Sequence, residues 1–282
     1  MAFSYQSLKQ LTGEAFLSET ISNANLADTT VDTGTIANNA VGSTKLATNA
    51  VDTTSNVVTG TLPISKGGLG TSSFSGANQA IVSNGTGLTT APHGIYGMQI
   101  WTSSGTWTRP SGVRYIKVQV QASGGGASGH GESGGCGGYS ERILNVTGIS
   151  SVSISISGEG SGTYYSGAGG NAGGTSFGNY CSASGGRGAN RNNQHSGGLG
   201  GVGSGGNLNM YGGGGGSHHQ RTGIGGSTFW GGAIAGGHPQ GGHFSHRHEG
   251  HGAPGAGGSG GYFHGHRGSN GLRGMVVVTM YY

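Results

Sequence analysis

Charged residues are scarce in this chain: only 8% of its 282 residues are Asp, Glu, Lys or Arg, and the formal net charge is +4. The basic residues are scattered without a Lys/Arg block, which argues against a nucleic-acid-binding surface or a polybasic membrane patch. No apolar run approaches the about 20 residues of a membrane span, and the N-terminus lacks the apolar region of a signal peptide. We therefore expect a soluble protein made in a cytoplasm, with no membrane insertion and no nucleic-acid partner.

Large apolar residues and cysteines are also few. Hydrophobic residues make up 32% of the chain, so its length is not matched by a large apolar core. Cys136 and Cys181 are too few for a disulfide framework. One bridge between them stays open as an alternative, but two free buried thiols are the favoured interpretation.

Glycine, in contrast, is abundant and unevenly placed. Of 68 glycines, 14 lie in residues 1–120 and the other 54 lie in residues 121–282, which is one residue in three. Collagen is excluded because the spacing is irregular and the whole chain has five prolines. The physical character of the chain therefore changes near residue 121.

A decapeptide repeat precedes this change. "VDTGTIANNA", "VGSTKLATNA" and "VDTTSNVVTG" follow one another from residue 31, with Val31, Val41 and Val51 in register. Each unit has two or three apolar residues, too few to bury a core within one chain, so the repeat is expected to pack against copies of itself. This predicts an oligomeric stalk, with a solvated linker as the alternative.

The segment after the repeat carries a resemblance. "LPISKGGLGT" followed by "VSNGTG", after Ala-Val and Lys-Leu-Ala units, resembles the shaft-to-tip junction of tailed-bacteriophage tail fibres over residues 30 to 92. The resemblance implies a trimeric fibre, with the N-terminus docked on the virion.

Five strands are readable beyond the junction. "MQIWT", "VRYIKVQVQA", "YSERILNVT", "VSISIS" and "MVVVTMYY" alternate apolar and polar residues and are rich in β-branched and aromatic types. Ile116, Val118 and Val120 share one face of their strand. Because the last strand is far in sequence from the others, we expect a small sheet or sandwich that holds both ends of a glycine-rich insert, residues 158–274, with a shorter glycine run at 123–138.

The insert has two interpretations. Disorder follows from the large backbone entropy that glycine loses on ordering. Order is available through polyproline-II geometry, in which three residues make a turn and bare glycines let neighbouring chains approach and exchange hydrogen bonds. "SGAGGNAGG", "GGLGGVGSGG" and "YGGGGG" are each long enough for two or three such turns.

This part of the chain carries a second resemblance, over most of residues 96–282. "WTSSGTWTRPSGVRYIKVQVQASGGGASG", "CGGYSERILNVT" and "GGNAGGTSFG" resemble the glycine-rich domain at the distal end of many phage fibres. The wider class includes adhesins whose tips are bundles of polyglycine-II helices with variable loops that touch the host. The resemblance implies host attachment.

An enzyme is not expected. Glycoside hydrolysis needs two facing carboxylates, and after Asp52 the acids are Glu132, Glu141, Glu159 and Glu249, none with an acidic neighbour. Glu141 is interpreted as a solvated strand residue. No G-x-S-x-G elbow follows a strand, and isolated G-x-G-x-x-G matches carry no information at this glycine content.

Histidines form two H-x-H pairs, His246 with His248 and His264 with His266. Three chains around an axis would present six imidazoles, a suitable shell for iron or another transition metal, as in some trimeric phage fibres. His243 or Glu249 are further ligands if the site lies within one chain. No other cofactor is expected, and surface contact is the favoured role.

Large donor-rich side chains interrupt the glycine runs, and we expect them on loops that contact a receptor. For the aromatic ones the alternative is that they fill gaps between glycine helices. The candidate contact residues are Arg187, Arg191, His195, His218, His219, Arg221, Phe229, Trp230, His243, Phe244, Arg247, Tyr262, Phe263 and Arg267.

The sequence thus predicts a mainly β and irregular fold: a homotrimeric fibre with a short repeat stalk and a distal domain of β-sheet and polyglycine-II helices. Residues 1–30 are expected to bind other tail or baseplate proteins, 31–95 to form the stalk and junction, and 96–282 to bind a host glycan or outer-membrane protein. The expected location is the virion, after assembly in the host cytoplasm. The alternatives are a structural component that presents or caps a separate receptor-binding protein, and an ice-binding protein, which would not explain the repeats.

Overall fold

The structure is a computed structural model, and it describes residues 79–83, 88–164, 167–190, 196–217, 223–233, 252–261 and 267–282. These residues belong to one compact unit, Leu62–Tyr282. They form twelve strands and no helix, so the predicted mainly β fold is confirmed. The decapeptide repeat and the predicted virion-attachment segment lie outside the described residues.

An antiparallel hairpin comes first. It joins β1 (Gln79–Ser83) to β2 (Leu88–Pro92), with Gln79 opposite Pro92 and Ser83 opposite Leu88. The hairpin lies within the segment that carries the tail-fibre resemblance.

The first of two five-stranded sheets has the order β11–β6–β5–β12–β3, and each neighbouring pair is antiparallel. Its strands are β3 (Ile95–Trp101), β5 (Tyr115–Gln121), β6 (Tyr139–Asn145), β11 (Leu208–Met210) and β12 (Met275–Tyr281). Because β12 lies between β5 and β3, residues from both sides of the glycine-rich region share this sheet, as the sequence predicted.

The second sheet has the order β10–β9–β8–β7–β4, again antiparallel throughout. Its strands are β4 (Gly105–Thr108), β7 (Ser151–Ile156), β8 (Thr175–Phe177), β9 (Cys181–Ala183) and β10 (Gly203–Ser204). The predicted strands correspond to β3, β5, β6, β7 and β12. The strands β4, β8, β9, β10 and β11 were not predicted, because two to four residues show too little periodicity, and neither was the hairpin of β1 and β2.

The core of this sandwich lies between the sheets. Apolar side chains from β5 and β12 face those from β4, β7, β8 and β9 in one buried cluster. Trp107 and Phe177 are fully buried at its centre, with ring centroids 5.9 Å apart. Along β7, Val152, Ile154 and Ile156 are buried and the serines between them are exposed, which confirms the predicted alternation.

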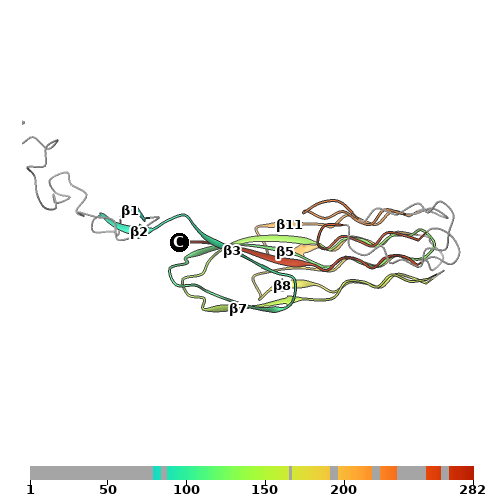
Figure 1. Cartoon of the computed structure of the whole chain (residues 1–282), viewed down its shortest axis with the longest axis horizontal. Coiled ribbons are helices and arrows are strands. Elements are labelled where there is room, and N and C mark those ends of the chain that lie inside the picture. The colour runs from blue at the N-terminus through green and yellow to red at the C-terminus, as the bar shows by residue number, and fades with distance from the viewer. Residues whose placement is uncertain are drawn as a thin grey trace, which may run out of the picture. The chain divides into compact units, whose positions relative to one another are not determined.

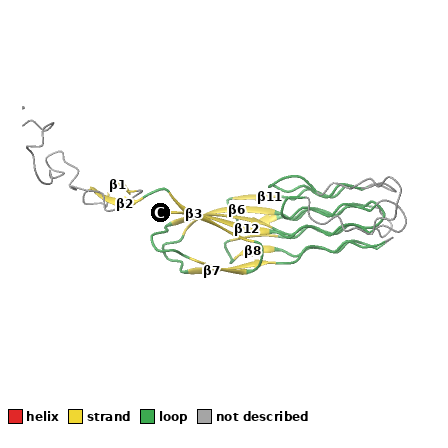
Figure 2. Cartoon of the chain, in the orientation of Figure 1, coloured by secondary structure: helices red, strands yellow, loops and turns green. Residues whose placement is uncertain are grey.

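The glycine-rich residues form extended segments that leave the sheets, run side by side away from them and return (Figures 1 and 2). We call each described segment a pass. The ten passes are pass 1 (122–129), pass 2 (132–138), pass 3 (157–164), pass 4 (167–174), pass 5 (184–190), pass 6 (196–202), pass 7 (211–217), pass 8 (223–228), pass 9 (255–261) and pass 10 (267–274). The predicted single insert is therefore wrong in one respect: the chain returns to the sheets between passes 4 and 5 and between passes 6 and 7.

Backbone hydrogen bonds between passes follow a period of three residues. Along pass 2, each successive N–H group donates to a different neighbouring pass, and every third residue returns to the same one, at N···O distances of 2.9 to 3.0 Å. The pairs are Ser133 to Gly216 and Cys136 to Gly213 on pass 7, Gly134 to Gly258 and Gly137 to Gly255 on pass 9, and Gly135 to Arg187 and Gly138 to Ser184 on pass 5. Of the two interpretations of the glycine-rich residues, the ordered one requires hydrogen bonds between neighbouring backbones, and these bonds are present in the described passes.

The neighbours define a closed arrangement. Passes 1 and 2 bond to each other, and each also bonds to five of the other passes. The remaining eight form a ring in the order 3, 4, 5, 6, 7, 8, 9, 10 and back to 3. The bonds that close this ring are, in turn, Gly170 to Ser161, Gly169 to Ala189, Ser184 to Val202, Gly212 to Gly201, Gly213 to Ser227, Gly257 to Gly226, Ser269 to Ser259 and Gly268 to Thr163.

Passes 1 and 2, which we call the inner passes, contain glycine because neighbouring backbones approach them closely. A Cβ added at Gly134 would lie 2.0 Å from the carbonyl oxygen of Gly125, and one at Gly125 would lie 2.1 Å from that of Arg187. Within the ten described passes, only Gly255 has φ in the left-handed region, at 80°. Glycine is therefore needed here for its bare Cα and not for unusual dihedral angles.

The two thiols are free and buried, as the favoured interpretation predicted, and no disulfide joins them. Cys136 lies in pass 2 and accepts a hydrogen bond from the N–H of Gly213 at 3.0 Å. Burial raises the pKa of Cys136 to about 11 and that of Cys181 to about 12. Both thiols are therefore protonated at neutral pH and serve packing, not nucleophilic chemistry.

Candidate functional site

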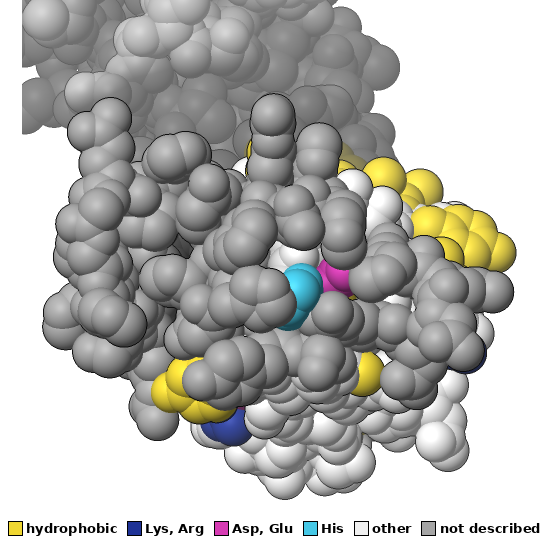
Figure 3. All heavy atoms as spheres, turned by 90° about the vertical axis from the view of Figure 1, so that its right-hand side faces the viewer, with side chains coloured by type: hydrophobic (Ala, Val, Ile, Leu, Met, Phe, Trp, Pro, Cys, Tyr) yellow, Lys and Arg dark blue, Asp and Glu magenta, His cyan; other side chains and the backbone are white. Residues whose placement is uncertain are grey.

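The end of the bundle opposite the sheets is the first candidate surface (Figure 3). There the turn between passes 1 and 2 carries Ser128, His130 and Glu132. Ser128 donates a hydrogen bond from Oγ to Oε2 of Glu132 and from its backbone N–H to the Glu132 carbonyl, the latter at 2.9 Å. Glu132 is fully buried and His130 nearly so. The turn is thus fixed by its own side chains, and Figure 3 shows histidine and acidic side chains on this end.

Passes 3 to 4, 5 to 6, 7 to 8 and 9 to 10 are joined by segments that lie outside the described residues. Most of the predicted contact residues and all the predicted metal ligands fall there or in residues 234–251. They are Arg191, His195, His218, His219, Arg221, His243, Phe244, Arg247, Tyr262 and Phe263, with His246, His248, His264 and His266 for the metal. Their roles stay predictions.

Arg267 is a predicted contact residue that the structure describes, at the start of pass 10. Its guanidinium lies over the ring of Tyr164, 5.4 Å from the centroid, and its Nε donates to the carbonyl of Gly162 at 3.1 Å. Tyr164 and Arg267 also form an isolated antiparallel bridge. Arg267 is therefore held by its own chain at the end of passes 3 and 10, with its charge at a half-exposed tyrosine.

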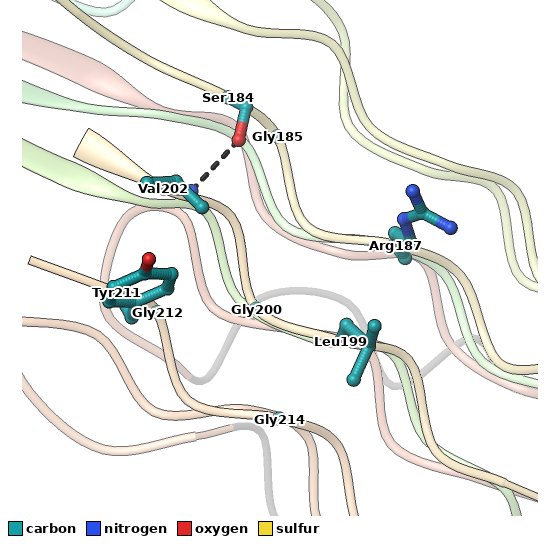
Figure 4. Close-up of a pocket in the computed structure, with 9 residues that line it drawn as sticks. All are labelled: Ser184, Gly185, Arg187, Leu199, Gly200, Val202, Tyr211, Gly212 and Gly214. Carbon is teal, nitrogen blue, oxygen red and sulfur yellow. Dashed lines mark hydrogen bonds between the residues drawn. The ribbon is translucent and has the colours of Figure 1, made fainter. Parts of the chain in front are cut away.

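Arg187 lies on the side of the bundle, at a groove of about 530 Å³ between passes 5, 6 and 7. Exposed side chains of Leu199, Val202 and Tyr211 line it over a floor of bare glycine (Figure 4). The N–H of Val202 donates to Oγ of Ser184 at 2.8 Å, which ties pass 6 to pass 5 at one end of the groove. Val202 and Tyr211 lie towards one end of the groove and Arg187 and Leu199 towards the other (Figure 4), and a groove with one cation, one phenol ring and two aliphatic groups suits an amphipathic ligand.

Phe229 and Trp230 follow pass 8, at the end of the bundle nearest the sheets, and not at the far end. Phe229 stacks on Tyr139, the first residue of β6, with ring centroids 4.1 Å apart and an interplanar angle of 17°. Trp230 stands at 90° to Phe229, with a centroid distance of 5.6 Å. Both rings stay partly exposed, so they contact the protein without being enclosed by it.

Tyr139 was not singled out from the sequence, although it is the partner that positions Phe229. The signal available was its place directly after the glycine run "GGCGG", where an aromatic side chain begins a strand. Nothing in the sequence linked it to residues 90 positions away.

Glu141 is a strand residue of β6, as predicted, but it is only partly solvated, with a side chain that is 23% exposed. Its Oε2 accepts a hydrogen bond from the hydroxyl of Tyr139 at 2.7 Å and lies 3.9 Å from Nζ of Lys117, which the sequence did not predict. The cross-strand positions of β5 and β6 bring these residues together. Glu159 pairs with Arg273 elsewhere, with Nε 3.2 Å from Oε2.

Among the residues that the structure describes, no group of three His, Cys, Asp or Glu side chains is arranged to hold a metal ion. The H-x-H pairs lie outside those residues, so the axial-metal hypothesis stays a prediction. Nor do the described residues include a helix with the length and apolar character for crossing a bilayer.

Comparison with known proteins adds no assignment, since no family model matches the chain and no curated protein is significantly similar to it.

Proposed function

We propose that this chain is a phage tail-fibre or tail-tip protein that attaches the virion to the host surface through its glycine-rich domain. The observation that carries the proposal is the array of hydrogen-bonded passes that starts at the sandwich and brings the chain repeatedly to the same far end. Such an array brings the ends of several passes together on a stiff support, and recognition residues are usually carried by a rigid scaffold of this kind.

The passes are proposed to be polyglycine-II helices. Two facts support this: the hydrogen bonds return to the same neighbour every third residue, and the helices of this type have three residues per turn and no internal hydrogen bonds. Bonds to surrounding passes then replace the missing internal ones. The close approach of bare Cα atoms to carbonyls at Gly134 and Gly125 fits the same geometry.

The rest of the chain fits this role as proposed from its sequence. Residues 1–30 dock on other tail or baseplate proteins, residues 31–95 form the repeat stalk and junction of a homotrimer, and residues 96–282 recognise a host glycan or outer-membrane protein. The protein is assembled in the host cytoplasm and acts on the virion. Adhesion does not need catalysis, and several weakly binding tips engaged at once multiply affinity through effective concentration.

We propose that recognition combines residues of the segments that join the passes with the side groove at Arg187. Large donor-rich side chains are concentrated in three of these segments, 191–195, 218–222 and 262–266. The exposed Tyr211 and Leu199 beside Arg187 extend the surface along the bundle.

The test is adsorption of virions that carry the altered fibre. A triple variant, Arg191→Ala, His195→Ala and Arg221→Ala, is expected to slow adsorption to a susceptible strain at least tenfold, and the purified variant chain is expected not to compete with wild-type virions. Arg273→Ala changes an exposed cation that pairs with Glu159 at the sheet end of pass 10; it is the matched control and should adsorb normally. Normal adsorption by a triple variant that is properly folded and assembled would favour the alternative, a structural component that presents or caps another receptor-binding protein.

A further inference from the structure

Two exposed aromatic rings lie at the sheet end of the bundle, beside Tyr139 at the start of β6. Phe229 is 48% exposed and Trp230 is 36% exposed, in the turn 228–231 that follows pass 8. Since most large apolar side chains of the sandwich core are below 10% exposure, this aromatic pair is not part of that core. A protein gains little from holding two rings at its surface unless they contact something.

The rings make a corner. Tyr139 covers one face of Phe229, so the exposed part of Phe229 is its other face and its edge. Trp230 is perpendicular to Phe229 and edge-on to Tyr139, at 73° and 6.3 Å. The arrangement gives one aromatic floor and one aromatic wall, both open to solvent.

The corner is preorganised by its turn. The backbones of Thr228 and Gly231 donate hydrogen bonds to each other's carbonyls at 3.1 and 3.4 Å, and the N–H of Trp230 donates to Oγ1 of Thr228 at 3.1 Å. Gly231 has φ of 152°, in the region that disfavours other residues. Rings that are already fixed lose little entropy when a ligand binds.

Polar groups lie at the hydroxyl end of Tyr139, the ring on which Phe229 stacks. Nε2 of Gln119 donates to the hydroxyl of Tyr139, which donates to Glu141, each at 2.7 Å, and Lys117 lies 3.9 Å from that carboxylate. Burial raises the pKa of Tyr139 well above its ordinary value, so the phenol remains a donor at every physiological pH. The side chains of Lys117 and Glu141 are 33% and 23% exposed, which leaves part of each accessible to a ligand's hydroxyl groups.

The chemistry of this surface selects among ligands. The faces of aromatic rings are electron-rich and attract groups with a weak positive charge, such as the C–H bonds on the apolar face of a pyranose. A quaternary ammonium would also suit two rings at right angles, but it needs a net negative site. Here Lys117 neutralises Glu141, so charge favours a ligand that is uncharged and rich in hydroxyls.

We propose that the corner of Phe229 and Trp230 on Tyr139 binds a neutral pyranose ring, with its C–H face on Phe229, its edge against Trp230 and its hydroxyls at Glu141 and Lys117. The proposal rests on the proposed function, because it adds a glycan subsite to the same adhesive domain. It places this subsite at the sheet end of the bundle.

The experiment is titration of the purified full chain with maltoheptaose, chitohexaose and dextran, followed by tryptophan fluorescence and by calorimetry. Trp107 is fully buried and Trp101 partly so, hence a shift in emission is expected to come from Trp230. At least one sugar should bind saturably, Phe229→Ala and Trp230→Ala should each weaken it at least tenfold, and Trp101→Phe should retain the response. Ile143→Ala removes a still more exposed apolar side chain, from β6, and should bind as wild type.

The proposal would be overturned if none of the three sugars gave a saturable response up to about 10 mM, beyond the millimolar range of weak sites. It would also be overturned if Phe229→Ala and Trp230→Ala both bound the sugar as tightly as wild type does. A third contrary result is tighter binding of choline, titrated in the same way, than of the sugars. Virion adsorption of the same variants separates the two ideas. If Phe229→Ala or Trp230→Ala abolishes sugar binding but the virions adsorb normally, the subsite exists but does not contribute to adhesion. If wild type binds the sugar and the triple variant of Arg191, His195 and Arg221 adsorbs normally, the proposed function is contradicted and the subsite is not.

Discussion

The sandwich and the glycine bundle are both close-packed, but they are packed by opposite means. In the sandwich, side chains such as Trp107 and Phe177 fill the space between two sheets. In the bundle, backbones fill the space themselves, and a Cβ at Gly134 would meet a carbonyl oxygen at 2.0 Å. A protein interior can thus be built either from bulky side chains or from their near absence, provided that hydrogen bonds are satisfied.

The energetics of the two regions differ accordingly. A buried Val, Ile or Phe contributes about 1.5–3 kcal/mol in the sandwich. In the bundle, ordering one residue costs about 1–2 kcal/mol, and a backbone hydrogen bond returns about 0.5–1.5 kcal/mol. The bundle is therefore close to break-even and depends on its anchors: every pass except 8 and 9 leads directly from or into a strand.

The largest expected effect comes from adding one carbon to the bundle. Gly134→Ala places a methyl group against the Gly125 carbonyl of the other inner pass, where only backbone could move aside. We expect a loss of at least about 3 kcal/mol in the free energy of unfolding, above the usual cost of overpacking. Denaturant unfolding of the purified chain measures it.

Gly158→Ala is the matched control, because an added Cβ meets nothing within 4 Å there and Gly158 is exposed. Its stability should stay within about 0.5 kcal/mol of wild type. Equal stability of the two variants would show that the inner passes are not packed backbone to backbone.

A comparable loss in the sandwich requires removing atoms. Phe177→Ala leaves a cavity beside Trp107 in the fully buried core, and we expect a loss of about 3–5 kcal/mol. Ile143→Ala, at a side chain that is 62% exposed, should have little effect. If Phe177→Ala unfolds at the same denaturant concentration as wild type, the sandwich is not stabilised by the packing of this side chain, and the comparison with Gly134→Ala is lost.

The smallest expected effect concerns the thiols, one in each region. Because burial raises their pKa from an ordinary 9.0 to about 11 and about 12, the unfolded chain loses these protons before the folded chain does. Stability from this source is complete below pH 9 and falls as pH rises towards 11 and beyond. The thermal unfolding temperature should decline more steeply from pH 8 to 11 for wild type than for the Cys136→Ala/Cys181→Ala variant.

Thiol labelling tests the burial of the two cysteines directly. At pH 8, a thiol reagent should label the native chain far more slowly than the unfolded chain, and rapid labelling of the native chain would contradict the burial of both thiols.

What could be predicted from the sequence followed from local pattern. Ile116, Val118 and Val120 alternate with polar residues, so their strand and its buried face were predictable. For "YGGGGG" the sequence left disorder and an ordered, hydrogen-bonded segment open, and pass 7 follows the second of these.

What could not be predicted depended on contacts between distant residues. Glu141 looks solvated in "YSERILN", but its partners Tyr139 and Lys117 are set by strand register and a rotamer choice. Phe229 and Trp230 gave no sign of which end of the bundle they occupy, because this depends on pass 8 running back towards the sheets. The order of passes around the ring is likewise a long-range property, since a glycine run carries no side-chain code for its neighbours.

β12 lies between β5 and β3 in the first sheet and pass 10 completes the ring, and both are made by residues 267–281. During translation, nine passes emerge from the ribosome before the segment that joins them arrives. A nascent chain at that stage has two unpaired strand edges, β5 and β3, and an open ring. A nonsense mutation upstream of residue 267 should therefore leave the first sheet without β12 and the ring of passes open, so the truncated chain is not expected to fold this unit.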